Sequence, residues 1–205
     1  YWWQLFIVLN GGGEEVRRSQ WIAYVGILSA LAALLMFFSF PIPFIPDFLR
    51  LDLAELPALV GLFILGPWGA IAIEGLKNLI HLLSTRTFGI GEIANFIIGC
   101  SLILGVQLGI RRKWGLWLSL FSGVMLMTLF AALTNRFFLI PLYAWVLNFP
   151  LEVMISLGNK ANSSIVDLTG LIVWGIIPFN LIKGLLVSSV ALLDVPRVTE
   201  LFKNK

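Results

Sequence analysis

The sequence predicts an all-α membrane protein with six transmembrane helices and both termini in the cytoplasm. Of its 205 residues, 59% are hydrophobic and 12% are charged, whereas about 25% of the residues of a soluble domain are charged. The mean hydropathy is +0.96. The apolar stretches are nearly continuous rather than alternating, which favours helices over a β-barrel.

The two ends of the chain differ from its middle. Residues 1–9 are apolar but shorter than the roughly 20 residues that span a bilayer, and three glycines follow. We expect residues 1–20 to be an interfacial segment or an artefact outside the native protein. Residues 21–194 form the membrane domain, and residues 195–205 form a basic cytoplasmic tail.

The first helix is expected from Trp21 to Phe40, a stretch without charge. Gly26, Ala30 and Ala33 have the spacing i, i+4, i+7 and give this helix a smooth face that another helix can approach closely. Contact within the bundle and docking to a separate membrane subunit both explain such a face.

The next segment, 41–52, contains three prolines within six residues, so we expect an extended loop. Phe44 and Phe48 make it apolar, and it could cover the bundle as a lid or lie at the interface. Asp52 and Glu55 precede the following apolar run, where acids suit a helix N-terminus.

Two helices are expected at 55–65 and 68–83, separated by the breaker Gly66-Pro67. The second helix carries four polar residues on or near one face, which is either neutralised internally or part of a pocket. These residues are Glu74, Lys77, Asn78 and His81.

The remaining helices are expected at 92–110, 114–134 and 168–193, with a short interfacial helix inside the connection 148–166. Glu92 in a first helical turn is ordinary compensation of the helix dipole. Asn95 lies one turn deeper, so dipole compensation does not explain it as easily. Asn135 follows the end of the helix 114–134.

The stretch 175–184 reads GIIPFNLIKG and lies deep in the last apolar run. Asn180 and Lys183 share one helix face, and Pro178 removes one helix hydrogen bond just before them. A lysine near the bilayer centre costs about 2.5–3.5 kcal/mol. Lys183 therefore binds a polar ligand, pairs with an acid or extends to the interface.

The distribution of basic residues predicts the orientation. With six spans, eight Lys and Arg residues lie on the cytoplasmic side and four lie outside, and Lys77 and Lys183 remain within the membrane. The polar residues then gather in the outer half of the bundle, which favours a pocket open to the outside over a continuous pore.

Several function classes are excluded or disfavoured. The net charge of +3 is spread through loops and indicates no nucleic-acid partner. One histidine and one cysteine exclude a His or Cys metal cluster, and neither a Ser/His/Asp set nor a phosphate-binding loop is present. An amide-rich pocket with nearby aromatic residues fits a planar heterocycle with a polyol tail, or another water-soluble vitamin.

Six motifs in order along the chain resemble the riboflavin-binding S components (RibU type) of energy-coupling factor (ECF) vitamin transporters. Together they run from residue 41 to residue 184 in the expected order. The motifs are PIPFIPDFLRLDLAELPAL (41–59), LGPWGAI (65–71), KNLIHLL (77–83), GEIANFIIG (91–99), NRFFLIPLY (135–143) and GIIPFNLIKG (175–184).

The resemblance implies a six-helix module of a prokaryotic cell membrane that binds riboflavin near its outer face as transported substrate, with no resident cofactor. It implies flavin-ring contacts from Asn135, Asn180 and Lys183, and a covering loop at 41–52. Contacts to the ribityl chain are expected from Asp52, Glu92 and Asn95. The resemblance also implies that the module docks onto a transmembrane coupling subunit, which two cytoplasmic ATPases drive. The docking face would consist of Gly26, Ala30 and Ala33.

Other functions stay open beside this one. An S component for another vitamin would use the same fold. An intramembrane enzyme would need a base beside a nucleophile, and His81 has no partner that the sequence identifies. An assembly protein would use its polar residues only to hold helices together.

Overall fold

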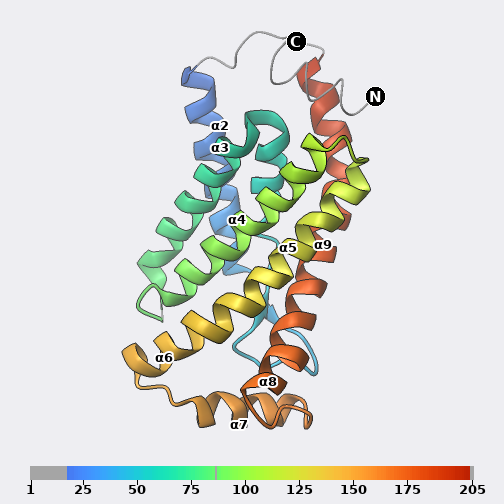
Figure 1. Cartoon of the computed structure of the whole chain (residues 1–205). Helices are drawn as coiled ribbons and strands as arrows, with labels where there is room; N and C mark the ends of the chain where they lie inside the picture. The colour runs from blue at the N-terminus through green and yellow to red at the C-terminus, as the bar shows by residue number, and fades with distance from the viewer. Residues whose placement is uncertain (1–17, 86, 204–205) are drawn as a thin grey trace.

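The computed structural model describes residues 18–85 and 87–203, and most of them are helical (Figure 1). Two long helices, α4 and α5, form the most extensive helix pair, and α3 and α9 pack beside them. Five described helical stretches are long and apolar enough to cross a membrane. The helices are α2 (Arg18–Phe37), α3 (Leu56–His81), α4 (Ile90–Arg111), α5 (Leu116–Thr134), α6 (Ile140–Leu147), α7 (Leu151–Ala161), α8 (Leu168–Leu171) and α9 (Ile177–Lys203).

Helix α3 folds back on itself at Gly66 instead of running straight (Figure 1). Gly66 has φ 76° and ψ −178°, a conformation that is essentially restricted to glycine, and Pro67 follows it. Glu55 and Lys77 lie 3.2 Å apart, although 22 residues of straight helix would separate them by about 33 Å. The predicted break at Gly66-Pro67 is therefore confirmed.

Two π-helical turns interrupt the regular α-helices. They are Asn135–Leu139 and Ile172–Ile176. The first joins α5 to α6, so residues 116–147 form one continuous apolar stretch. The second joins α8 to α9. Helix α9 continues through Pro196 to Lys203, ten residues beyond its expected end at Leu193.

The segment between α2 and α3 is non-helical, as its prolines predicted, and it closes on itself through a short antiparallel ladder. Its two strands, β1 (Phe40–Pro41) and β2 (Arg50–Leu51), pair in the register Phe40 to Leu51. The buried side chains of Ile45 and Leu51 pack with Phe179 and fix the segment against α9.

Helix α7 is the short helix expected within 148–166. It buries Met154 and Gly158 and leaves Val153 and Leu157 partly exposed. Tyr143 and Phe149 pack against a cluster of buried apolar side chains that includes Ile140, Met154 and Leu171.

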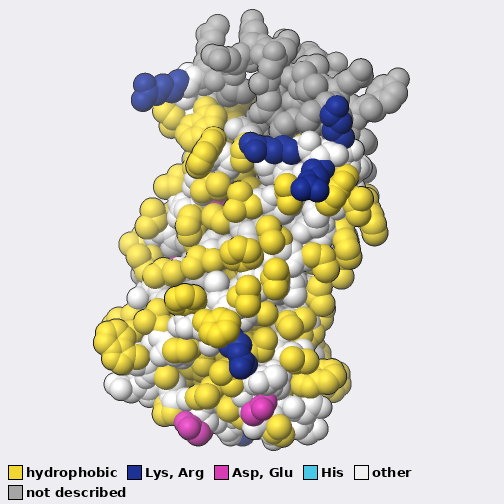
Figure 2. Space-filling model, viewed as in Figure 1, with side chains coloured by type: hydrophobic (Ala, Val, Ile, Leu, Met, Phe, Trp, Pro, Cys, Tyr) yellow, Lys and Arg dark blue, Asp and Glu magenta, His cyan; other side chains and the backbone are white. Residues whose placement is uncertain are grey.

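Helix α2 begins and α9 ends at the same end of the bundle (Figure 1). Figure 2 shows Lys and Arg side chains gathered toward that end and a broad hydrophobic surface over the middle of the molecule. Of the expected N-terminal segment 1–20, residues 18–20 form the start of α2, and residues 1–17 lie outside the described residues.

Candidate functional site

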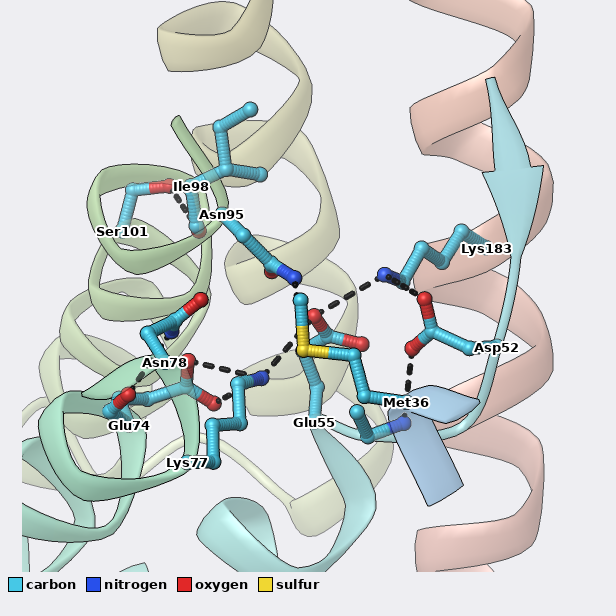
Figure 3. A network of polar contacts seen from close by, with 11 residues as sticks. Met36, Asp52, Glu55, Glu74, Lys77, Asn78, Asn95, Ile98, Ser101 and Lys183 are labelled. Atoms are coloured by element: carbon cyan, nitrogen blue, oxygen red, sulfur yellow. Dashed lines mark hydrogen bonds and ion pairs between the residues drawn. The ribbon is translucent and has the colours of Figure 1, made fainter. Parts of the chain in front are cut away.

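Five charged side chains form a continuous buried network inside the bundle (Figure 3). The Lys183 ammonium lies 3.1 Å from Asp52 Oδ2 and 3.0 Å from Glu55 Oε1. The Lys77 ammonium lies 3.2 Å from the same Glu55 oxygen and 2.9 Å from the Glu74 carboxylate. The network therefore joins the 41–52 segment, both arms of α3, and α9.

Glu55 is the centre of this network because both ammonium groups reach its Oε1 atom. Burial alone would raise the pKa of its carboxyl, but Lys183 and Lys77 offset this and lower the pKa to about 2. It makes no side-chain capping bond to α3. Its role is therefore tertiary, unlike the N-terminal role that its position suggested.

Asp52 connects the loop to α9. Besides its contact with Lys183, its Oδ1 accepts a hydrogen bond from the Ala54 backbone N–H at 2.9 Å. This contact confirms one of the three interpretations of Lys183, that the lysine pairs with an acid. It also brings a cation, a carboxylate and the 41–52 segment together.

Glu74 lies at the other end of the network and packs against α4. A Cβ atom placed on Gly99 would overlap with Glu74 Oε2, so only glycine fits at this position without movement of the carboxylate. Asn78 donates from Nδ2 to the Glu74 backbone carbonyl at 2.8 Å and is buried beside it.

Asn135 and Asn180 show the same local geometry. Each donates from Nδ2 to the carbonyl four residues earlier, Ala131 for Asn135 and Ile176 for Asn180, at 2.8 Å in both cases. Each contact involves residues at or next to a π-helical turn, a feature that often occurs at functional sites. These bonds occupy part of each amide's donor capacity and fix its orientation.

Asn180 lies one turn from Lys183 on α9 and is buried. Asn95 reaches from α4 toward Met36 of α2, with a long contact of 3.7 Å from Nδ2 to Sδ (Figure 3). The structure thus places Asn95 and Asn180 beside the network and Asn135 on the neighbouring π-helical turn.

Glu92 belongs to a different cluster, at the turn between α3 and α4. Its Oε1 lies 2.8 Å from His81 Nδ1, and its Oε2 accepts hydrogen bonds from the hydroxyls of Thr85 and Thr87. His81 thus has a partner that the sequence did not identify, and it does not pair with Lys77.

Phe44 and Phe48 lie at the surface, with 78% and 45% of their area exposed. Phe44 has φ 65°, a conformation that is uncommon for an aromatic residue. The structure does not bring either ring into the buried network.

The expected docking face on α2 is divided. Gly26 and Ala30 are exposed, and a Cβ on Gly26 would meet nothing within 4 Å. Ala33 is only 3% exposed and packs inside the bundle, so it is not part of an exposed face in this conformation.

Comparisons with known proteins agree with this architecture. The family described as "ECF transporter, substrate-specific component" matches residues 20–193. The chain is 34% identical over 201 residues to the riboflavin transporter RibU of Staphylococcus aureus (strain TCH60), an alignment that covers 96% of this chain and 100% of that protein. It is 33% identical over 175 residues to the riboflavin transporter FmnP of Bacillus subtilis (strain 168), covering 82% and 86%.

A solved structure described as "Structure and mechanism of the S component of a bacterial ECF transporter" superposes with a TM-score of 0.72 at 29% identity. The match covers 91% of this chain and 99% of the other. The motifs, the fold and the family match agree, and the chain belongs to the family of ECF transporter substrate-specific components.

Proposed function

We propose that this protein binds riboflavin from outside the cell as the substrate-specific subunit of an ECF importer. The observation that carries the proposal is similarity, over 96% and 82% of the chain, to two proteins named riboflavin transporters. The family is one of transporter components, so the proposed role is capture and transfer rather than catalysis.

The binding site is proposed at the end of the bundle where the two π-helical turns lie. Asn135 and Asn180 would bind the flavin ring through amide groups whose orientation is fixed by their bonds to preceding carbonyls. The Lys183 ammonium would donate hydrogen bonds to the ring.

The ribityl chain and the approach to the site involve the remaining predicted residues. Asp52, Asn95 and Lys183 lie where several polar groups meet (Figure 3), and ribityl hydroxyls can donate to carboxylates or accept from ammonium groups. Lys77 and Asn78 would support this end through the network. Glu92 would act by shaping the α3–α4 turn, and Phe44 and Phe48 are proposed to cover the ligand when the loop closes.

The topology is proposed as six crossings with both termini in the cytoplasm. Helix α3 is one of the five apolar stretches. Because the chain reverses at Gly66, we count its two arms as two crossings, which gives six in total. Gly26 and Ala30 are proposed to contact the coupling subunit, through which two ATPases would drive transport across a prokaryotic cell membrane.

The test is the visible absorption spectrum of detergent-purified protein, followed by a riboflavin titration monitored by fluorescence quenching. Co-purified flavin or stoichiometric quenching supports the proposal. Absence of both, together with quenching or calorimetric binding of another vitamin, contradicts riboflavin specificity and retains the S-component role. Absence of binding to the whole vitamin panel contradicts substrate capture.

A further inference from the structure

The buried network contains more acidic than basic groups. Among the described side chains it holds three carboxylates, from Asp52, Glu55 and Glu74, and two ammonium groups, from Lys77 and Lys183. If all five were charged, one negative charge would remain uncompensated in the interior. Isolated charges are strongly disfavoured there, and such a group becomes neutral instead.

The hydrogen bonds show the same imbalance. Within the described part of the chain, the buried atoms Glu55 Oε2 and Asn78 Oδ1 accept no hydrogen bond, and Glu74 Oε2 accepts none although the Lys77 ammonium lies 2.9 Å from it. All three are acceptors, so no rearrangement among them can satisfy any of them. A proton on one carboxylate oxygen converts an acceptor into a donor and removes the excess charge at the same time.

The position of the proton follows from the contacts of each carboxylate. Glu55 receives two ammonium groups, and Asp52 receives Lys183 and a backbone N–H. Burial raises the pKa of Asp52 although the charge of Lys183 opposes that effect, but Asp52 has a hydrogen-bond donor at each of its oxygens. Among the described residues, Glu74 contacts one ammonium group, that of Lys77, which lies 2.9 Å from each of its oxygens and donates a hydrogen bond to Oε1.

Close packing favours a proton over a larger cation at Glu74. The Oε2 atom lies so close to Gly99 that even one methyl group would overlap with it, and a metal cation needs several oxygen ligands arranged around it. We propose that Glu74 Oε2 is a proton-binding site, and that the protein resides in the membrane with Glu74 as a neutral carboxylic acid.

The first test is infrared spectroscopy of the whole purified protein in D2O at neutral pH, because a protonated carboxyl absorbs at higher frequency than the amide I band. We expect one such band in the parent protein, its loss in Glu74→Gln, and its retention in Glu152→Gln, a matched control at an exposed acid of α7. Absence of the band from the parent overturns the proposal. A band that persists in Glu74→Gln, or disappears in Asp52→Asn instead, overturns the assignment to Glu74.

Thermal unfolding provides a second measurement that does not depend on the spectrum. Glutamine replaces a neutral acid with a neutral amide of similar shape, so Glu74→Gln should keep the unfolding midpoint of the parent. Glu55→Gln, which removes an ionised partner of two lysines, should lower it clearly. A large loss in Glu74→Gln, or failure to fold, shows that the ionised form is required and overturns the proposal.

A comparison of sodium with choline chloride at equal concentration separates a proton from a metal cation. Equal midpoints in the two salts are expected. A rise specific to sodium that disappears in Glu74→Gln means that sodium occupies the site, and it overturns the proton assignment.

Discussion

The Lys183 ammonium lies 3.1 Å from the Asp52 carboxylate, although 131 residues separate the two in the chain. The pair joins the loop that precedes α3 to the second turn of α9, and both side chains are about 93% buried. An ion pair at this position has two possible tasks, to hold the loop in place and to present polar groups to a ligand.

Replacing Lys183 separates these tasks. Lys183→Ala leaves buried carboxylates without their ammonium partner, and breaking such a pair costs about 3–5 kcal/mol of folding free energy. The double variant Lys183→Met/Asp52→Asn removes both charges and should recover much of that stability. It should not recover riboflavin binding, because the ring contact is still absent. Thermal unfolding and a fluorescence titration measure the two effects, and recovery of binding would exclude Lys183 from the site.

The two asparagines near the π-helical turns should affect binding more than folding. Asn135→Ala and Asn180→Ala each remove a hydrogen-bonding amide from the proposed ring contact, and we expect each to weaken riboflavin binding by about 1–3 kcal/mol. Gln107→Leu is the control, because it replaces a buried amide near the C-terminal end of α4 that is not part of the proposed site. If both alanine variants bind riboflavin as the parent does, the amides are not ring contacts.

Gly99 should tolerate no side chain. The added methyl group of Gly99→Ala overlaps with Glu74 Oε2, so the carboxylate or α4 must move, and overpacking of this kind costs about 1–3 kcal/mol. Gly26→Ala is the matched control, since its new methyl group meets no atom of the described residues within 4 Å. We expect a lower unfolding midpoint for the first variant and an unchanged or higher one for the second. Equal midpoints would show that Glu74 moves away without cost.

Substitutions at an exposed and at a buried position of α2 should separate effects on docking from effects on folding. Ala30→Leu adds bulk on the exposed side of the helix, so it should leave riboflavin binding intact and reduce co-purification with the coupling subunit. Ala33→Leu adds the same bulk inside the bundle and should lower stability by about 1–3 kcal/mol. Normal assembly of the Ala30 variant would place the docking surface elsewhere.

The sequence alone predicted the features that depend on local chemistry. Composition indicated the membrane class, and Gly66-Pro67 indicated the break, because glycine permits and proline enforces a departure from helical geometry. Prolines likewise predicted the non-helical segment before α3. The family motifs identified the class of protein through residues spread along most of the chain.

Other features depend on tertiary contacts that spacing does not encode. Glu55 was interpreted as an acid at a helix start, because its partners Lys77 and Lys183 become neighbours only when α3 folds back and α9 packs beside it. Ala33 shares a helical face with Gly26 in projection, yet the neighbouring helices cover it. The π-helical turns lie within apolar runs, and the hydrophobic pattern of these runs does not indicate where the turns occur.

The reversal at Gly66 also has a consequence for biosynthesis. Residues 56–65 make a helix of about 15 Å, half the thickness of the hydrocarbon layer, so this arm cannot be recognised as a span by itself. It must enter the bilayer together with the arm that follows, as a hairpin. Because Glu55 and Lys77 face each other across that hairpin, the newly made segment carries its own counter-ion when it leaves the insertion machinery, before α9 has been translated.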